Sequence, residues 1–469
     1  MNEQADLGTF DDQKSATEIR ESSITEDEGS DAGIEFWPSL PESWATVSPD
    51  SVFDVNPRYD TNTDENPYIE MDALDTVLPY PKYIGTRNAA DYSGKRFKTG
   101  DTLFARITPC TENGKIGFVP ELDGKVGIGS TEYAVLSPKP GEIHPWFLYY
   151  VARSHPIRDY AISRMRGSTG RQRVPFDVFR REIDVPLPPM EEQQNIAAVL
   201  NNVDQIIDTT NKIIDQLARV KKGLIKEFYS EGYYDHEEWQ EVDKQDAYVM
   251  TRADKIPAEW EIRQSGEIAD VKTGHTPSTS VDEYWDGDIS WVDIHDLTQL
   301  EKTVIETTDD TITEEGLENS GAKLLPEGTL VLCRTGAIGE TAILGKEMAT
   351  DQDQVTFECD ESIVLPRYLM YLFEFATPQL ERLSAGSTHD KVQLHFFSDL
   401  EIPLPSLDEQ QEIVDALESV DDVVIANKEQ LDGLKRLKTG LQQDLFSGDV
   451  RTSGKEIEIP DEVKNHEPE

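Results

Sequence analysis

The sequence predicts an α+β protein built from two repeats, each a globular domain followed by one long helix. The first observation is an internal duplication, because the segment 186–230 recurs without a gap as 403–447. The second is a sustained run of apolar residues at alternating steps of four and three in that segment, which is typical of a coiled-coil helix. The third is a series of short apolar runs between Gly, Pro, Asn and Asp in the preceding parts, which predicts strands separated by turns.

Matched segments in the two halves set the predicted domain boundaries. VPLPPMEEQQNIAAVL (185–200) returns as IPLPSLDEQQEIVDAL (402–417), and shorter matched motifs precede it at offsets between 216 and 228. The predicted order is a disordered acidic tail (1–36), a first globular domain (37–187), a first helix (188–230), a polar connector (231–255), a second globular domain (256–404), a second helix (405–448) and an acidic tail (449–469).

The apolar seam of the two predicted helices extends over five heptads. In the first copy it runs through Ile196, Leu200, Val203, Ile207, Thr210, Ile214, Leu217, Lys221, Leu224 and Phe228. The second copy repeats it, with polar residues at the same two places, as Ile413, Leu417, Val420, Val424, Asn427, Leu431, Leu434, Lys438, Leu441 and Leu445. We expect the helices to pair with each other over about 50 Å, at ~1.5 Å per residue. Matched polar positions favour a fixed register, with ordinary substitution as the alternative.

Acidic residues dominate the charge of the chain. A total of 92 Asp and Glu against 44 Lys and Arg gives a net charge of −48. This balance indicates a solvated acidic surface of the kind found in halophiles, and an acidic mimic of nucleic acid is the alternative. No apolar run is long enough for a membrane span and the acidic N-terminus is unlike a secretory signal, so we expect a cytoplasmic protein.

Motifs that carry catalysis are missing from the sequence. The segment 93–96 fails as a phosphate-binding loop because Ala89 stands where the first glycine is required. Asn66-Pro67-Tyr68 lacks the second proline of an adenine-methyltransferase turn, and the histidines show no zinc-protease spacing. The sequence therefore predicts a binding protein with no catalytic residues, no metal ligands and no cofactor of its own.

Positive charge is concentrated in the first globular domain. Residues 41–183 hold 18 bases and 19 acids, whereas the matching span 257–400 holds 9 bases and 29 acids. Eight arginines fall within residues 153–181, a segment with only two acids. The planar donor fork of arginine suits phosphates and guanine edges. We therefore expect an anionic partner, most simply nucleic acid, with pairing to acidic neighbours as the alternative.

Several motifs resemble one known family. YWxGxISWV (284–292), preceded by TGHTPS (273–278), looks like the target-recognition domains of type I restriction–modification specificity subunits. LPEG (325–328) and RTGAIG (334–339) are similar to the same family, as are Gly-Ser-Thr and the Pro-Leu-Pro and Glu-Gln-Gln elements that close each half. The first half resembles a different subtype through LFARITPC (103–110) and lacks the TGHTPS element. The resemblance covers about 37–449.

The resemblance implies both a fold and a function. In the family, two target-recognition domains sit at opposite ends of an antiparallel helix pair with approximate two-fold symmetry, and each recognises one half of a split DNA site. The unequal halves imply an asymmetric site, and a spacer of ~50 Å corresponds to between one and two duplex turns of ~34–36 Å. The implied partners are double-stranded DNA, two methyltransferase subunits with S-adenosylmethionine, and two translocase–nuclease subunits with ATP and Mg²⁺.

Candidate site residues follow from these motifs. The predicted DNA contacts in the first half are Arg106, Arg164, Arg166, Gly167, Ser168, Thr169, Arg171 and Arg173. In the second half they are Thr273, Gly274, Thr276, Arg334, Gly386, Ser387, Thr388, His389 and Lys391. For Arg106 and Arg334 a buried ion pair is an equal alternative, and Trp291 is expected in the core.

The Glu-Gln-Gln elements at the helix starts are expected to bind the methyltransferase subunits, through Glu192, Gln193, Gln194, Glu409, Gln410 and Gln411. Two rival functions remain open at this point. One is a coiled-coil scaffold that joins proteins of a DNA-processing or defence complex without recognising sequence. The other is a catalytic subunit, against which the missing motifs argue.

Overall fold

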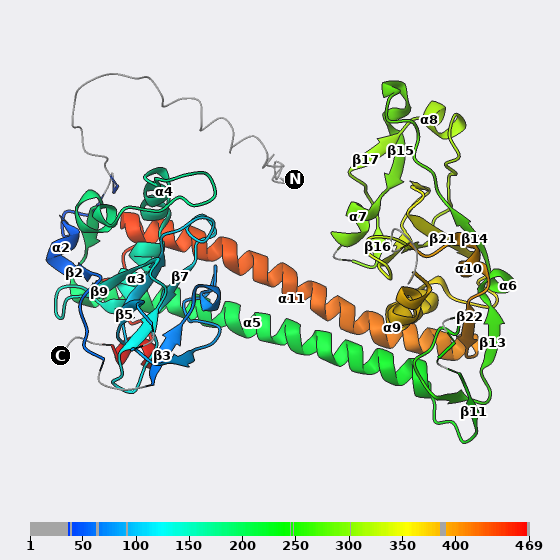
Figure 1. The fold of residues 1–469 in the computed structure, drawn as a ribbon, viewed down its shortest axis with the longest axis horizontal. Coiled ribbons are helices and arrows are strands. Elements are labelled where there is room, and N and C mark those ends of the chain that lie inside the picture. Colours follow the sequence, from blue (N-terminus) through cyan, green and yellow to red (C-terminus); the bar gives the residue numbers. More distant parts are fainter. Residues whose placement is uncertain are drawn as a thin grey trace, which may run out of the picture. The chain divides into compact units, whose positions relative to one another are not determined.

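The computed structural model describes residues 36–37, 40–61, 65–90, 92–243, 245–246, 248–300, 302–384 and 391–466 of the chain (Figure 1). They form two compact units, one comprising residues up to Ala197 together with those from Gln443 onward, the other Ala198–Gln442. Residues 1–35 of the predicted acidic tail lie outside the described residues. Phe36, the last residue of that predicted tail, is buried with its ring edge-on to Tyr160. The first globular domain therefore begins at least one residue earlier than predicted.

Two four-stranded sheets form the first unit. One has the order β2-β9-β6-β7 and is antiparallel, with β2 (Phe53–Val55), β9 (Tyr133–Pro138), β6 (Thr102–Ala105) and β7 (Ile116–Phe118). The other has the order β4-β3-β8-β5, with β4 (Gly85–Arg87), β3 (Asn66–Ile69), β8 (Gly127–Gly129) and β5 (Lys95–Phe97). The remaining elements are β1 (Ala45–Val47) paired with β10 (Val185–Leu187), α2 (Pro49–Val52), η1 (Met71–Ala73), α3 (Pro145–Arg153), α4 (His155–Ser163) and the π-helical turn η2 (Val178–Glu182).

The second unit is built around a five-stranded sheet. Its order is β14-β21-β18-β19-β16, with β14 (Ala269–Thr273), β21 (Gln354–Cys359), β18 (Leu330–Cys333), β19 (Thr341–Leu344) and β16 (Val304–Ile305). A three-stranded sheet contains β17 (Asp310–Ile312), β15 (Trp285–Val292) and β20 (Ala349–Thr350). Two antiparallel ladders pair β11 (Trp239–Glu241) with β12 (Lys255–Pro257) and β13 (Glu261–Gln264) with β22 (Glu401–Leu404). The helical elements are α6 (Ser265–Ile268), η3 (Asp282–Tyr284), α7 (Ile294–Thr298), α8 (Glu314–Glu318), α9 (Pro366–Ser384) and α10 (Leu394–Ser398).

The same plan is repeated in both units. The sheet β2-β9-β6-β7 corresponds to β14-β21-β18-β19, and the ladder β1–β10 corresponds to β13–β22. Where the second unit has the single helix α9, the first has α3 and α4, separated by extended backbone at Ser154. These matches confirm the duplication and the α+β class that the sequence predicts.

Buried aromatic side chains hold the helices against these sheets. In the first unit, the ring of Trp146 on α3 stacks on Phe118 of β7 with 3.9 Å between centroids. In the second unit, Tyr368 and Phe373 of α9 belong to one buried cluster with Phe357 of β21. An antiparallel sheet with one covered face needs such an apolar helix face, because each fully buried side chain of this size contributes ~1.5–3 kcal/mol.

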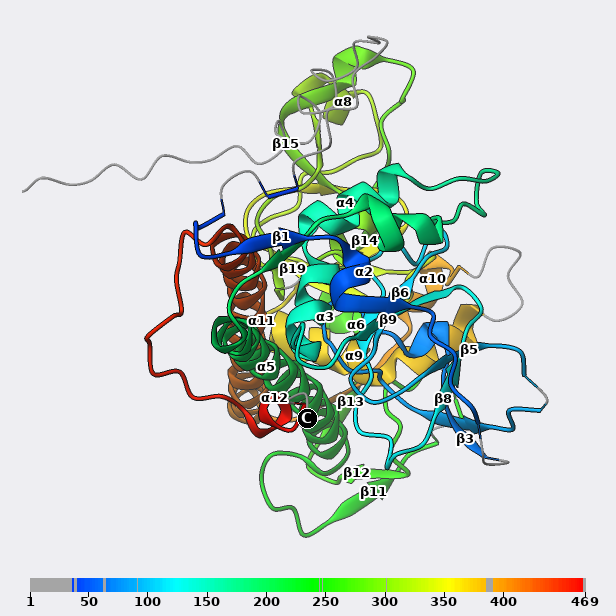
Figure 2. The ribbon, with the colours of Figure 1, turned by 90° about the vertical axis from the view of Figure 1, so that its left-hand side faces the viewer.

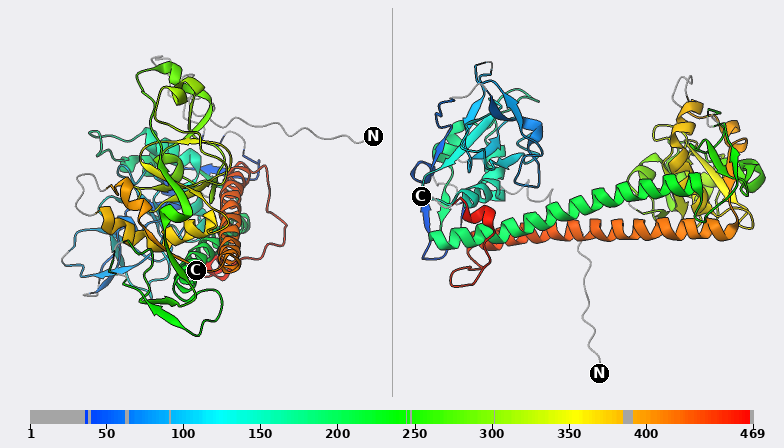
Figure 3. Two further views of the ribbon diagram at one scale, coloured as in Figure 1. Left: turned by 90° about the vertical axis from the view of Figure 1, so that its right-hand side faces the viewer. Right: turned by 90° about the horizontal axis from the view of Figure 1, so that it is seen from below.

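Two long helices carry the predicted seam. They are α5 (Met190–Glu231) and α11 (Leu407–Ser447), which lie side by side in Figures 1 and 3. Their ends fall within two residues of the predicted bounds. All twenty seam positions are buried or half-buried, so the seam assignment is confirmed.

Two equivalent ion pairs join α5 to α11 within the second unit. Lys221 Nζ lies 2.9 Å from an Asp421 carboxylate oxygen, and Lys438 pairs with Asp204. The residue numbers of both pairs have the same sum, 642, which fixes an antiparallel register. The repeat offset of 217 relates Lys221 to Lys438 and Asp204 to Asp421. The two lysines of the seam therefore occupy equivalent positions in the two copies of the repeat.

Glu374 of α9 lies 3.2 Å from Lys221 and makes its pair a three-charge cluster. Burial lowers the pKa of Lys221, but the carboxylates of Glu374 and Asp421 outweigh that effect and raise it. The lysine therefore stays charged, and the interaction between the helices is retained across neutral pH.

The C-terminal segment is packed, contrary to the prediction of an acidic tail, and the predicted polar connector is packed as well. The C-terminal segment, predicted as a tail from 449, returns beside the start of α5 (Figure 2) and includes α12 (Asp461–Lys464). Val463 is fully buried, and Trp146 Nε1 donates to the Glu462 carbonyl at 3.1 Å. In the predicted connector 231–255, Met250 is fully buried and its N–H donates to a β22 carbonyl. Composition failed here because a few apolar residues suffice to anchor an acidic segment.

Candidate DNA interface

The Gly-Ser-Thr element of the first unit forms a closed loop. Its ends are joined by two backbone hydrogen bonds between Arg166 and Arg173, at 3.0 and 2.9 Å. Gly167 and Gly170 take φ values of +133° and +80°, which side-chain-bearing residues rarely adopt. A turn in which Arg171 N–H donates to the Ser168 carbonyl completes the tip. The loop is therefore a hydrogen-bonded hairpin and not an irregular loop.

Four predicted contact side chains project from this loop into solvent. They are Arg166, Ser168, Thr169 and Arg171, and neither arginine has a side-chain partner among the residues that the structure describes. What distinguishes these two arginines from other exposed arginines, such as Arg58 and Arg219, is that a loop with hydrogen-bonded ends presents them. Among the predicted residues that the structure describes, Arg166 and Arg171 are thus the best placed to bind an anionic ligand.

Other predicted arginines make contacts inside the first unit. Arg164 Nε lies 2.8 Å from Glu182, which also accepts a hydrogen bond from Tyr160. Arg173 lies 2.9 Å from Glu132, and this pairing raises its pKa. Both therefore position the loop, whatever else they contact.

Arg106 holds the C-terminal end of the loop through the backbone of Val174. Its Nε donates to the Val174 carbonyl at 2.8 Å, while the Val174 N–H donates to the Arg106 carbonyl at 2.9 Å. In the second unit Arg334 N–H groups reach the Val392 and Gln352 carbonyls, and the Val392 N–H donates back to Arg334 at 2.9 Å. For Arg106 and Arg334 the sequence left a buried ion pair as an alternative to DNA contact. Arg106 does form an ion pair, because its Nη1 lies 3.5 Å from Glu132. Arg334 instead satisfies backbone carbonyls.

A second matched contact closes each loop. The Arg173–Glu132 pair of the first unit corresponds to Lys391 and Asp353 in the second, which lie 2.7 Å apart. Gly386, Ser387, Thr388 and His389 lie outside the described residues. Lys391 is therefore a loop anchor, and the predicted contacts of the second loop tip stay predictions.

Next to this anchor lies the predicted TGHTPS turn of the second unit. Thr276 donates through its hydroxyl to Gln352 Oε1 at 2.8 Å, and Thr273 donates to the Gln354 carbonyl. Gly274 is required because a Cβ there would lie 1.9 Å from the Thr350 carbonyl oxygen. Arg334 binds the Gln352 carbonyl, so the turn and the loop base share one residue. Lys391 Nζ also donates to the Gln352 carbonyl, so the structure brings five of the predicted second-half residues together: Thr273, Gly274, Thr276, Arg334 and Lys391.

Trp291, expected in the core, is 6% exposed and packs edge-on against Trp285. Its Nε1 donates to the His275 carbonyl at 3.3 Å. The indole thus supports the TGHTPS turn from beneath, and the prediction that it belongs to the core is confirmed.

At the helix starts, the predicted partner-binding residues are engaged internally. Glu192 accepts hydrogen bonds from Trp44 Nε1 at 3.0 Å and from Arg451 at 2.8 Å, and Glu409 accepts equivalent bonds from Trp260 and His236. All of these bonds lie within one unit or the other. Such side chains are unavailable to a partner subunit in this structure.

Gln193 and Gln410 are also buried, with 2% and 0% exposure. Gln193 accepts from the His144 N–H at 2.8 Å and Gln410 from the Leu365 N–H at 2.9 Å. The sequence shows that the Glu-Gln-Gln motif is repeated, but it does not show that these side chains form hydrogen bonds within each unit. The repeated Glu and Gln fasten each helix start to its globular part, which leaves Gln194 and Gln411 as half-buried and exposed candidates.

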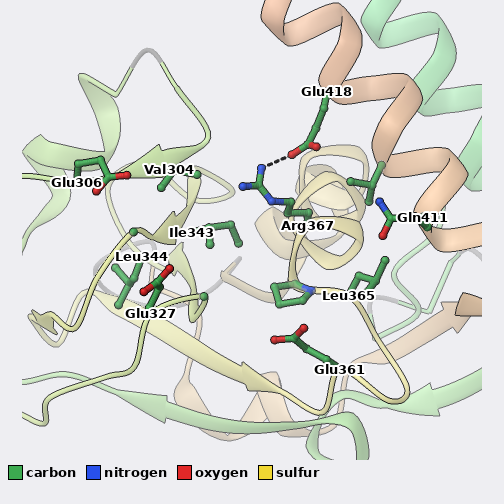
Figure 4. A pocket seen from close by; sticks show the side chains of 14 residues that line it. Val304, Glu306, Glu327, Ile343, Leu344, Glu361, Leu365, Arg367, Gln411 and Glu418 are labelled. Atoms are coloured by element: carbon green, nitrogen blue, oxygen red, sulfur yellow. Dashed lines mark hydrogen bonds and ion pairs between the residues drawn. The ribbon is translucent and has the colours of Figure 1, made fainter.

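Gln411 lines a cavity of about 600 Å³ in the second unit (Figure 4). Its charged lining consists of Arg367, which pairs with Glu418, and three further carboxylates: Glu306, Glu327 and Glu361. This excess of negative charge disfavours a phosphate ligand. The cavity is therefore not part of the DNA interface.

Three residues around the loop were not among the predicted contacts. Lys95, Phe176 and Arg180 gather beside Arg106, with Arg106 Cζ 4.1 Å from the Phe176 ring centroid. The sequence signal was weak because Lys95 is distant in the chain and Arg180 was one of eight clustered arginines.

Comparison with known proteins agrees with this geometry. The family model for the type I restriction modification DNA specificity domain matches residues 41–219 and 257–436. The chain is 31% identical over 223 residues to the type I restriction enzyme MjaIX specificity subunit of Methanocaldococcus jannaschii, covering 47% of this chain and 51% of that protein. The match therefore spans about half the length of that relative.

Longer matches extend over both halves. The putative type I restriction enzyme MjaX specificity subunit of the same organism is 22% identical over 382 residues, covering 80% of this chain and 84% of that protein. A solved chain described under "Structural basis underlying complex assembly and conformational transition of the type I R-M system" covers 88% of this chain and 99% of its own, with a TM-score of 0.56 and 20% identity. That likeness shows a shared fold. Because the family model matches most of both halves, this chain belongs to the type I restriction modification DNA specificity family.

Proposed function

We propose that this chain is the DNA-recognition subunit of a type I restriction–modification complex and recognises an asymmetric, two-part DNA site. The observation that carries the proposal is the matched loop. In each unit an arginine and an ion pair hold its base, and in the first unit the tip presents Arg166 and Arg171 to solvent. Rigid presentation of a few side chains suits recognition of base edges in a groove.

The two units differ in charge and in the residues that follow the loop, so the two half-sites are expected to differ in sequence. Residues 41–183 are nearly neutral, whereas residues 257–400 carry 29 acids against 9 bases. The helix register fixed by Lys221–Asp421 and Lys438–Asp204 would set one spacer length.

Methyltransferase subunits are the proposed partners of the helix pair. Three apolar side chains of α5 at heptad spacing, Ile206, Ile213 and Val220, are 41–47% exposed. At the equivalent positions of α11, Val423 and Leu437 are 46% and 52% exposed. Repeated exposed apolar positions are typical of protein interaction surfaces. Two equivalent stripes would bind two copies of one partner.

The chemistry is assigned to those partners. In the proposed complex the methyltransferase subunits supply S-adenosylmethionine for adenine methylation, and translocase–nuclease subunits supply ATP and Mg²⁺. The chain itself would be non-catalytic and would act in the cytoplasm, where the DNA is. No helix in the part of the chain that the structure describes is long and apolar enough to cross a membrane.

The test is methylation of genomic DNA by the full chain co-expressed with its methyltransferase subunit, mapped by single-molecule sequencing. The expected result is methylated adenine in one split, asymmetric motif. Arg166→Ala with Arg171→Ala should reduce methylation at that motif by roughly 30-fold or more, because two base contacts at ~1–3 kcal/mol each total at least ~2 kcal/mol.

The matched control is Arg58→Ala with Lys125→Ala, which removes the same charge from exposed positions outside the loop. It should leave the motif and its methylation level unchanged. Equal methylation by the loop variant and the wild type would instead support the scaffold function. Methylation by the isolated chain would support a catalytic one.

A further inference from the structure

Three cationic side chains surround one aromatic ring in the first unit. The centroid of the Phe176 ring lies 4.7 Å from Lys95 Nζ, 4.1 Å from Arg106 Cζ and 5.7 Å from Arg180 Cζ. They come from three parts of the chain: the strand β5, the segment after β6 and the turn η2. Phe176 itself follows the loop by three residues and Arg106 binds Val174, so this cation cluster lies at the base of the loop.

The charges of this cluster are not balanced by neighbouring carboxylates. Glu132 is shared between Arg106 and Arg173, and Asp177 lies 3.8 Å from Arg180. Among the residues described, Lys95 forms no ion pair. Burial lowers its pKa, the positive charges of Arg106 and Arg180 lower it further, and Glu132 only partly offsets them.

An aromatic ring explains how the cations can be held together. The face of a ring attracts a cation by ~0.5–2 kcal/mol through its quadrupole and adds no negative charge. A carboxylate in the same place would hold the cations but neutralise them. The cluster is therefore built to keep positive charge available in a strongly acidic chain.

The shared fold does not require this arrangement. Phe179 and Phe397 are equivalent, fully buried core residues at an offset of 218. By the same offset, Leu394 and Ser398 of the second unit stand where the first has Phe176 and Arg180. The second unit keeps the matching four-strand order β14-β21-β18-β19 and the loop anchors without these two residues, so neither Phe176 nor Arg180 is required for that part of the fold.

We propose that Lys95 and Arg180, arranged around Phe176, bind a phosphodiester group of the DNA backbone next to the loop. The proposal rests on the DNA-binding function proposed above and adds the site that fixes the position of the duplex. Lysine acts on phosphate as a point charge, and arginine adds paired donors. About half to two-thirds of protein–DNA hydrogen bonds are made to the backbone, and these position the protein without specifying sequence.

The experiment measures binding of the full chain, assembled with its methyltransferase subunit, to a 40-base-pair duplex of mixed sequence by fluorescence anisotropy across KCl concentrations. Lys95→Gln and Arg180→Gln should each weaken binding several-fold for every sequence tested. The double variant should reduce the slope of log affinity against log salt by about 0.9, the value for one lost phosphate contact on B-DNA, and each single variant should reduce it by part of that amount.

The control is Lys139→Gln, which removes the same charge at the other end of β9 from Glu132, roughly 20 Å away at ~3.4 Å per residue. Its slope should equal that of the wild type. Phe176→Leu, which copies the second unit, should weaken binding while thermal melting reports whether the fold is kept. A neutral methylphosphonate at the contacted position should weaken the wild type but not the double variant Lys95→Gln with Arg180→Gln.

The outcomes separate the two proposals. If the wild type methylates a split motif but Lys95→Gln and Arg180→Gln keep the wild-type slope, the phosphate site is wrong and the recognition function stands. If inorganic phosphate alone binds the site and the variants lose only that binding, the cluster holds a small anion and the DNA assignment is overturned. If the wild type shows no salt-dependent DNA binding, both proposals are overturned.

Discussion

Replacing Lys438 by methionine tests whether the ion pairs between the long helices stabilise their pairing. The side chains of Lys438 and Asp204 are only 8% and 2% exposed. Loss of one partner from a buried pair removes the interaction and leaves the other charge out of water, at a cost of about 3–5 kcal/mol. Lys438→Met should therefore destabilise the second unit by that amount.

The equivalent pair provides an internal comparison. Lys221 and Asp421 are 19% and 15% exposed, and Asp421 also accepts a hydrogen bond from Tyr371 at 2.6 Å. Water and this hydroxyl continue to solvate Asp421 when the lysine is removed. Lys221→Met should therefore have the smaller effect, about 1–2 kcal/mol, between the values for exposed and buried pairs.

Thermal melting of the full chain by circular dichroism at 222 nm measures both effects. For a unit of this size, 1 kcal/mol shifts the melting temperature by roughly 2–4 °C, so Lys438→Met should lower it by about 10 °C. The double variant Asp204→Leu with Lys438→Met should recover most of the loss, because an apolar pair replaces both charges. A double variant as unstable as the single one, or a shift below 2 °C for Lys438→Met, would refute the reasoning.

Three further outcomes follow from the structure. Burial raises the pKa of Asp101 to about 7; because the folded state then holds this proton more tightly than the unfolded chain, stability should fall as pH rises from about 4 to about 7. Asp101→Asn should remove this fall, by up to about 4 kcal/mol, and an unchanged pH profile of the melting temperature would contradict it. Glu192→Ala removes the bonds from Trp44 and Arg451 and should expose the C-terminal segment to limited proteolysis, whereas Glu191→Ala, an exposed neighbour, should not. With a net charge of −48, the melting temperature should rise with KCl as screening reduces repulsion, and a flat response would contradict the halophilic interpretation.

The helices could be predicted closely because their sequence signals are local and repeated. Prolines at 188–189 and 405 set the starts, and the seam from Ile196 and Ile413 onward sets the buried face. Even the polar seam positions were informative, because Lys221 and Lys438 stand at matched places. Their partners were not predicted, since Asp421 and Asp204 lie one position outside the seam.

The site could be predicted only as a region. Arg173 and Lys391 stand out as cations beside Gly-Ser-Thr, yet their partners Glu132 and Asp353 lie about 40 residues away in the chain. No local pattern separates such an anchor from an exposed arginine such as Arg171. Alignment of the two halves identifies both pairs, because Arg173 aligns with Lys391 and Glu132 aligns with Asp353, so the sign of each charge is the same in the two units.

The anchoring of the loop would also allow one fold to carry the two different recognition surfaces proposed above. Arg106 and Arg334 hold the loop bases through backbone atoms of Val174 and Val392, and backbone bonds do not depend on which side chains the tip carries. Substitutions between the anchors therefore leave the base in place and change only what is presented. The same holds for the position of Phe176, where a leucine in the second unit leaves the sheet order unchanged. Divergence of the two proposed half-sites would need no change in the helices, whose ion pairs separately fix the register.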